Sequence, residues 1–343
     1  KGRSFDEMIE MLDSGYNAAS KSGIYVSTRK AMQQSTVWAC AKIISEIIAT
    51  LPIAAQTRQG GKWVTAELHQ AIELIHSPND WMTKHELISF LVLWSELSGQ
   101  GYCLKNRTLR GEVKRLLPLE SDRVHVDDSR EWELKYDVSN FGTGIAPDRV
   151  FHLRNFGTSA YKGLSTIGNH REGIGLALQM EAHAQAAYKN GLMTSKYLSK
   201  EGRLSKEQRK DIEEDLAMFT GAVNTGKMPV FSNGMKLEEV GRLSSVDMQY
   251  IESRQMQKQE IAAVFGVPLF LLNDTQKSTT WGSGLEQISR AFVKFSLDPR
   301  LSRIAQTLLR ELLPPGERRT TRFIFDTDQF TLGDFKSRMD GYK

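Results

Sequence analysis

Apolar residues recur along the chain with two different periods, which separate helical from strand-like segments. From Ser35 to about Leu51 they lie three or four residues apart, which predicts a helix capped by Ser35 and ended by Pro52. A second, nearly all-apolar helix follows Thr83 and Glu86, which match the capping-box pattern. We expect this second helix to lie at the centre of a core.

Between about Gly101 and Asn155 the pattern changes to short β-like runs. Turn residues such as Arg110-Gly111 and Gly142-Thr143-Gly144 separate the runs, which predicts a small antiparallel β unit. The expected strands are Tyr102–Leu104, Val113–Leu117, Arg123–Val126, Trp132–Val138 and Val150–Leu153.

Two long helical patterns bracket the next segment. They cover residues 168–190 and 244–265, with about fifty residues between them that include a hairpin-like stretch. A further helix is expected over residues 285–313, kinked or split at Pro299. The sequence therefore predicts a mixed α+β fold whose peculiarity is a compact insert between two long helices.

The composition is that of an ordinary globular chain. Of 343 residues, 40% are hydrophobic and 25% charged, which excludes a disordered, collagen-like or coiled-coil chain. The net charge of +4 neither indicates nor excludes nucleic-acid binding. The most apolar stretches, residues 43–54 and 87–94, are shorter than the ~20 residues of a membrane helix, so we expect no membrane contact.

The two cysteines indicate the redox compartment of the chain, and its polar N-terminal residues indicate how it begins. Cys40 and Cys103 match no metal or redox spacing, and their apolar surroundings predict that both are buried and reduced, as in a reducing compartment. Residues 1–34 are polar and are interpreted as an N-terminal arm. No signal segment opens the chain at Lys1, and we expect its true beginning to be missing.

A search for catalytic motifs identifies no enzyme. No P-loop occurs, and Gly173-Ile174-Gly175 is half of a dinucleotide motif that we assign to helix packing. Asp326 and Asp328 follow a strand-like run and could together hold a divalent ion. A metal-dependent phosphodiesterase using this pair is kept as an alternative function, and no cofactor is expected otherwise.

Charged and polar residues gather in four places. Residues 189–210 are rich in cations and acidic residues follow at once, as in a solvated helix or a contact between subunits. A second basic patch, residues 300–322, fits contact with phosphate or with another protein. The polar middle of the helix 244–265 must meet water or a polar conduit. In the polar loop 273–284, Trp281 is either a satellite-core anchor or a contact for a passing polymer.

Eight short segments of the chain resemble, in order, the portal proteins of tailed bacteriophages, in the subfamily typical of long-tailed phages. The resemblance runs across about residues 30–313. The segments are Ser35–Pro52, His76–Asn79, Gly99–Cys103, Leu116–Leu119, Val150–Arg154, Gly163–Ile167, Lys189–Gly191 and Ile261–Leu272.

The resemblance implies a non-enzymatic ring subunit at one vertex of the capsid. It implies a dodecamer in the virion, through whose channel double-stranded DNA is pumped by the terminase motor, a separate protein. The DNA contacts should be weak and independent of sequence, because tight phosphate contacts would stall translocation. Capsid or scaffold proteins and neck or tail proteins are the other implied partners, and the host cytoplasm is the site of assembly. A head–tail adaptor that forms no ring is the remaining alternative.

The family's parts can be placed along this sequence. The placement gives an N-terminal arm (1–34), a wing (35–167), a first stem helix (168–190), a clip (191–243), a second stem helix (244–266), a tunnel loop with a long wing helix (267–313), and a C-terminal segment (314–343) that is a reduced or truncated crown.

Three sets of site residues follow from this placement. The tunnel loop set, expected to line the DNA channel, is Gln276, Lys277, Ser278, Thr279, Thr280 and Trp281. The stem set, expected on the channel face, is Gln255, Lys258 and Gln259. The clip set, expected in subunit or motor contacts, is Lys196, Lys200, Arg203, Lys206, Arg209, Lys210, Asp211 and Glu214.

Overall fold

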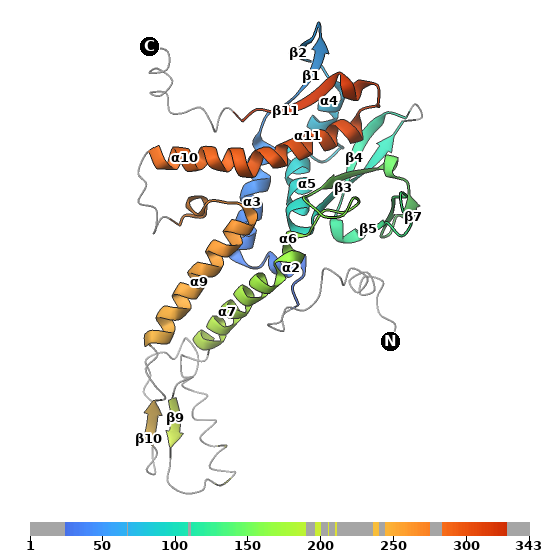
Figure 1. The fold of residues 1–343 in the computed structure, drawn as a ribbon. Coiled ribbons are helices and arrows are strands. Elements are labelled where there is room, and N and C mark those ends of the chain that lie inside the picture. The colour runs from blue at the N-terminus through green and yellow to red at the C-terminus, as the bar shows by residue number, and fades with distance from the viewer. Residues whose placement is uncertain are drawn as a thin grey trace.

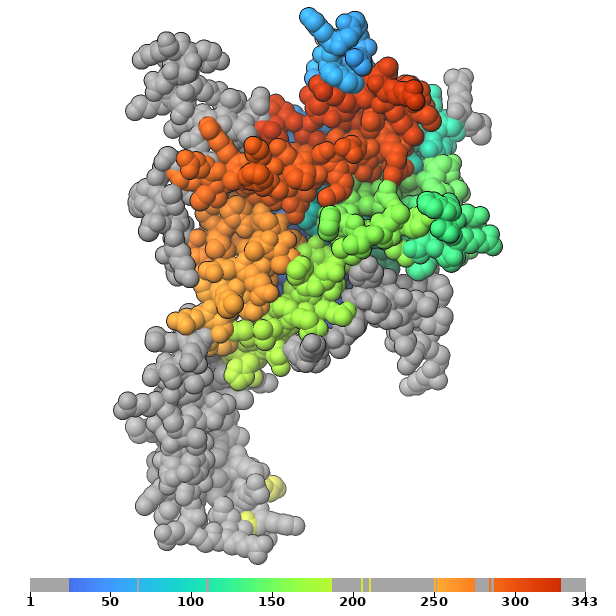
Figure 2. All heavy atoms as spheres, in the orientation of Figure 1, coloured from blue at the N-terminus to red at the C-terminus, as the bar shows by residue number. Residues whose placement is uncertain are grey.

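Helices and small antiparallel sheets form a body from which a pair of long helices projects (Figures 1 and 2). The structure is a computed structural model of the chain. It describes residues 25–66, 68–108, 111–189, 196–199, 205, 210, 236–239, 244–274 and 283–327. The predicted α+β class is confirmed.

Two helices at the centre of the body pack against each other and carry much of its main core. They are α3 (Ser35–Thr50) and α5 (Lys84–Ser98). The capping box of Thr83 and Glu86 is present as predicted. The predicted cap of α3 is wrong by one residue, because the Oε1 atom of Gln34 accepts the hydrogen bond from the Val37 backbone N–H at 2.8 Å.

Two short helices complete the N-terminal part of the body. They are α2 (Thr28–Ala31) and α4 (Gln70–His76), and α4 packs against α5. Both cysteines lie in the main core with no exposed surface, Cys40 on α3 and Cys103 on the strand β3. Both thiols are free, as expected, and burial raises the pKa of Cys40 to about 12 and raises that of Cys103 as well.

The predicted β unit is present, but as two three-stranded antiparallel sheets. In one, β3 (Gln100–Arg107) is the central strand. A second core cluster lies between this sheet and the other one. The expected strand at residues 132–138 begins only at Lys135, and Trp132 before it has a positive φ of 68°. The remaining strands are β4 (Val113–Leu119) and β8 (Val150–Arg154) beside β3, and β5 (Val124–Asp127), β6 (Lys135–Val138) and β7 (Gly142–Ile145) in the second sheet.

A third sheet joins the two ends of the described chain. Its central strand β1 (Ile53–Gln59) pairs with β2 (Lys62–Thr65) and with β11 (Thr321–Phe325), so that Ile53 lies opposite Phe325. The sequence predicted the strand β11 but did not predict that it pairs with β1. A two-stranded sheet, β9 (Lys196–Ser199) with β10 (Lys236–Glu239), lies beyond the far ends of the projecting helices (Figure 1).

The long helix expected after the polar loop is interrupted, as predicted, near Pro299. It consists of α10 (Ser283–Phe292), a π-helical turn (Val293–Leu297) and α11 (Asp298–Leu312). Proline lacks an N–H group and its ring clashes with the carbonyl group four residues earlier, and a wider turn relieves that clash. The helix runs across the body below β1 and β2 in this view, and α11 packs on β8 and β11 (Figure 1).

Candidate functional site

The projecting pair consists of α7 (Arg171–Lys189) and α9 (Ser244–Phe265), which run antiparallel. The hydroxyl group of Tyr250 donates to the Met180 carbonyl oxygen at 2.9 Å, and nearer the body Gly173 of α7 faces Glu260 of α9. The predicted start of the first helix differs slightly, because α6 (Thr166–Asn169) precedes α7. By length, α7 and α9 extend roughly 28 and 33 Å.

One side of α9 is exposed and the other is held against the body. Glu252, Met256 and Glu260, four residues apart, are exposed, whereas Ile261 and Phe265 near the end are buried in the main core. The exposed side is therefore largely polar, which agrees with the predicted contact with water or a polar conduit.

The predicted stem set meets the base of the polar loop. Asp274, the last described residue in the first part of that loop, accepts hydrogen bonds from Gln255 and Lys258 of α9. The Lys258 ammonium group lies 3.2 Å from the Asp274 carboxylate, whose side chain is only 7% exposed. Gln259 is half-buried. Gln255 and Lys258 thus already have a partner within the chain. Their contacts with Asp274 hold the start of the loop against α9.

Most residues of the other two sets lie outside the described residues. This applies to the whole tunnel loop set, Gln276 to Trp281, and to Lys200, Arg203, Lys206, Arg209, Asp211 and Glu214 of the clip set. Lys196 lies on β9, in register with Glu239 of β10, and Lys210 is an exposed helical residue. The roles assigned to these sets stay predictions.

A buried ion pair connects α9, α5 and α11 where the projecting pair meets the body. The guanidinium group of Arg300 binds the Glu96 carboxylate through two 2.8 Å hydrogen bonds. It also donates to the Phe265 carbonyl oxygen, the last residue of α9, and to Ser296 of the π-helical turn. The Glu96 side chain is 4% exposed. Sequence reasoning placed Arg300 in a basic patch and missed this partner 204 residues away.

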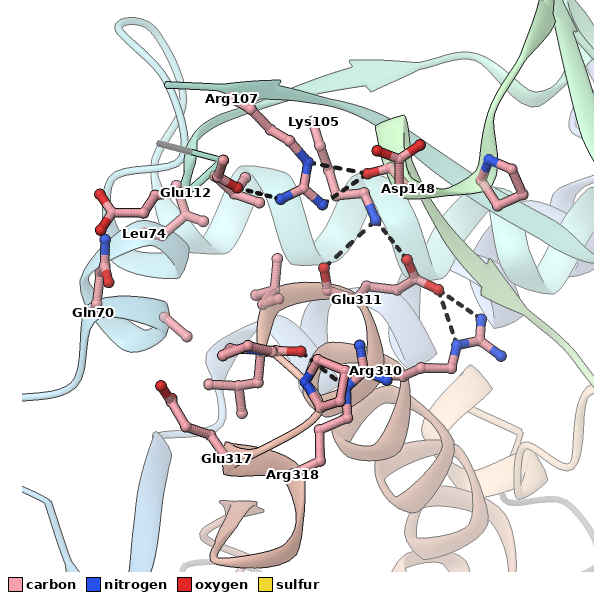
Figure 3. A pocket seen from close by; sticks show the side chains of 18 of the residues that line it. Gln70, Leu74, Lys105, Arg107, Glu112, Asp148, Arg310, Glu311, Glu317 and Arg318 are labelled. Carbon is pink, nitrogen blue, oxygen red and sulfur yellow. Dashed lines mark hydrogen bonds and ion pairs between the residues drawn. The ribbon is translucent and has the colours of Figure 1, made fainter. Parts of the chain in front are cut away.

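A cleft of about 970 Å³ lies between β3, α4 and the end of α11 (Figure 3). The ammonium group of Lys105 lies 2.7 Å from the Glu311 carboxylate, which also binds Arg310 at 2.7 Å. Arg107 donates to the Asp148 carbonyl oxygen. Burial lowers the pKa of Lys105. The ion pair of Lys105 with Glu311 therefore fastens α11 to β3 across this cleft.

The alternative metal site is not supported. Asp326 follows β11, and its backbone N–H donates to the Pro52 carbonyl oxygen at 3.0 Å, while Asp328 lies outside the described residues. Within the described part of the chain, no group of three or more His, Cys, Asp or Glu side chains is placed to hold a metal ion. Among the helices in that part, none combines the length and apolarity needed to span a bilayer.

Comparison with known proteins first identifies the class of fold. A chain in the neck of a native gene transfer agent particle, computed with C12 symmetry, aligns with a TM-score of 0.63 and 22% sequence identity, covering 98% of this chain and 93% of that one. This chain therefore shares its fold with that chain of a gene transfer agent neck.

The sequence comparisons then give the family. The sequence model of the phage portal protein family matches residues 35–343, and the chain belongs to that family. The portal protein of Enterobacteria phage HK97 is 30% identical over 318 residues, which are 91% of this chain and 75% of the relative. The probable portal protein of Streptomyces phage phiC31 is 30% identical over 336 residues, with coverages of 94% and 73%.

Proposed function

We propose that this chain is the subunit of a portal ring, through which double-stranded DNA enters and leaves a phage-like particle. The single observation that carries this proposal is its membership of the phage portal protein family over residues 35–343. The antiparallel pair α7 and α9, projecting from an α+β body, agrees with it, because a channel through a ring needs elements long enough to line it (Figure 1). The C12 symmetry of the related neck supports a dodecamer.

The polar exposed side of α9 and the loop that follows Asp274 are the proposed channel elements. Side chains such as Glu252 and Glu260 repel phosphate, and the cation Lys258 is paired with Asp274. Such a surface binds DNA weakly, as transport requires, because net phosphate neutralisation determines non-specific affinity. Gln276 to Trp281 are proposed as the tunnel loop.

The segment 191–243 is proposed as the clip that meets the terminase motor and later the neck or tail proteins. The remaining parts follow the division into a wing, stem and clip given above. Capsid or scaffold proteins are proposed to contact the wing. The subunit is proposed to have no catalytic activity, and to reside in the virion after assembly in the host cytoplasm.

The test is the mass of the purified chain in solution by light scattering, with negative-stain images. Closed rings with a central hole are expected. A ring with the subunit number proposed for the virion would have the mass of about twelve chains. A compact dimer would contradict the proposal and favour an adaptor that forms no ring. Assembled rings should bind short duplex DNA weakly, and Lys277→Glu should weaken this binding further while leaving the ring mass unchanged.

A further inference from the structure

Arginines of the second basic patch have partners inside the chain, and two of them also line a pocket. Arg300 binds Glu96, as described above. Arg318 donates to the Leu313 carbonyl oxygen, and Arg322 stacks on the ring of Trp63 at 4.5 Å. Arg303 and Arg310, seven residues apart and therefore on one face of α11, line a separate pocket of about 370 Å³. Arg303 and Arg310 are thus the members of the patch that line this pocket, whereas Arg319 is exposed.

The pocket is lined by cations and by uncharged polar groups. Arg154 of β8 and Lys162 of the following loop lie opposite Arg303 and Arg310, and no carboxylate is among the described residues that line the pocket. Lys162 pairs with Asp128 at 3.1 Å and Arg310 with Glu311. For Arg154 and Arg303, no carboxylate lies within ion-pair distance in the described part of the chain.

The positive charges of Arg154 and Arg310 repel each other. Burial, followed by the nearby charge of Arg310, lowers the pKa of Arg154, and burial lowers the pKa of Arg303. Hydrogen bonds keep the arginine side chains at the pocket despite this repulsion. Arg154 donates to the Ala160 carbonyl oxygen, and Arg303 donates to the Asn155 side chain at 2.7 Å. An anion entering the pocket would relieve it.

The loop that forms the other wall is fixed before any ligand binds. A Cβ atom on Gly163 would lie 2.3 Å from the Gly99 carbonyl oxygen, and one on Gly157 would lie 2.7 Å from the Lys162 carbonyl oxygen. Both positions therefore need glycine for close packing. Ser159 Oγ accepts the backbone N–H groups of Tyr161 and Lys162, which leaves its own hydrogen to donate. A pocket that is already ordered loses little entropy when it binds.

We propose that this pocket, lined by Arg154, Ser159, Lys162, Arg303, Thr307 and Arg310, binds a phosphate group. Guanidinium forks, an ammonium group and hydroxyl donors are the side chains that bind phosphate oxygens in proteins and in protein–DNA complexes. The phosphate belongs either to a nucleic-acid backbone or to free phosphate. The site lies on β8, α11 and the loop between β8 and α6, and no described residue of α9 lines it. It is independent of the channel proposed above.

The test uses the full chain and a pair of charge-matched double variants. Lys162→Gln with Arg303→Gln removes two cations from the pocket, whereas Lys42→Gln with Arg58→Gln removes two exposed cations elsewhere. Binding of a fluorescent 20-base-pair duplex is measured by anisotropy over a range of NaCl concentrations. Thermal unfolding is measured in inorganic phosphate and in chloride at equal ionic strength.

If the phosphate comes from nucleic acid, the pocket variant binds the duplex at least about fivefold more weakly, and its salt slope falls by about one, because the contact with one phosphate is lost. If free phosphate is the ligand, phosphate raises the Tm of the wild-type chain and of the control but not that of the pocket variant, while duplex binding is unchanged. Both results support the pocket.

The proposal is overturned if the pocket variant and the control respond alike to the duplex and to phosphate. It is also overturned if the pocket variant loses only binding of polyglutamate, since that result assigns the pocket to an acidic polypeptide. If the pocket double variant does not fold, Thr307→Glu replaces it, because this change keeps all four cations and places a carboxylate among them. Light scattering on the same samples gives the mass of the assembled protein. Ring formation is therefore tested separately from phosphate binding.

Discussion

At the residue scale, His152 is a buried histidine whose protonation state follows from its neighbours. Its Nε2 atom lies 2.6 Å from the Oε1 atom of Gln100, which can only accept, so Nε2 carries the hydrogen. Its Nδ1 atom accepts from the Tyr136 hydroxyl at 2.9 Å. The side chain is 2% exposed, and burial, with Arg154 and Arg310 nearby, holds its pKa well below the usual range. A neutral imidazole satisfies both partners, and a charged one would not.

This lowered pKa predicts a loss of stability in acid. Below a pH of about 6.5 the unfolded chain binds a proton at this histidine and the folded chain does not, so the free energy of unfolding falls by up to about 1.4 kcal/mol per pH unit. Urea unfolding between pH 5 and pH 8 measures this slope. His152→Gln should be less stable at pH 8 but should show a flatter slope, whereas exposed His76→Gln should keep the wild-type slope. Equal slopes in all three proteins would refute the assignment.

Local signals at single residues were readable from the sequence where both partners lie within one turn. The Thr83 and Glu86 capping box is such a case, and so is the burial of Cys40 on an apolar helical face. The bonds of His152 were not readable, because Gln100 lies 52 residues away. The Gln34 cap was missed because glutamine is an uncommon cap and a serine follows it.

At the element scale, the salt bridge between Lys258 and Asp274 ties the end of one helix to the start of a loop. Asp274→Asn removes the charge and keeps the size of the side chain. We expect amide hydrogen exchange in Leu269–Leu272 and in the last turns of α9 to become at least about threefold faster, because local opening then breaks a weaker contact.

Glu252→Gln is the control for this experiment, because Glu252 is an exposed carboxylate of the same helix. It should leave exchange in both segments unchanged. The interpretation fails if Asp274→Asn and Glu252→Gln give the same exchange pattern.

Helices were predicted well where the apolar periodicity agrees with the capping and helix-ending residues, as for α3, α5 and α9. The place where the long helix breaks was predicted from Pro299 alone, but the π-helical turn before it was not, because its geometry depends on the packing of Ser296 and Leu297 inside the body. The pairing of β11 with β1 also escaped prediction, since Ile53 and Phe325 are joined by contacts that leave no local pattern. The roles of the tunnel loop, stem and clip sets all stay predictions.

At the scale of the whole molecule, Arg300 of α11 binds both Glu96 of α5 and the end of α9 at Phe265. Arg300→Ala leaves the Glu96 carboxylate buried without its partner, and we expect it to lower the free energy of unfolding by about 3–5 kcal/mol. Arg319→Ala, at an exposed position after α11, should change it by less than about 0.5 kcal/mol. Chemical denaturation measures both.

A double-mutant cycle separates the ion pair from simple loss of packing. Glu96→Leu combined with Arg300→Met removes both charges and keeps apolar volume, so the double variant should be more stable than the sum of the single effects predicts. Strict additivity would show that the two charges act independently, and the junction would then depend on Phe265 and its apolar neighbours alone.

The burial of both cysteines has a practical consequence for experiments on the assembled particle. Cys40 and Cys103 have no exposed surface and raised pKa values, so maleimide and iodoacetamide reagents, which need an accessible thiolate, should leave the native chain unmodified. Ser253→Cys, on the exposed side of α9, would then be the only reactive thiol of each subunit, provided none is added elsewhere. Fluorophores or spin labels could report distances across a ring without first removing native cysteines.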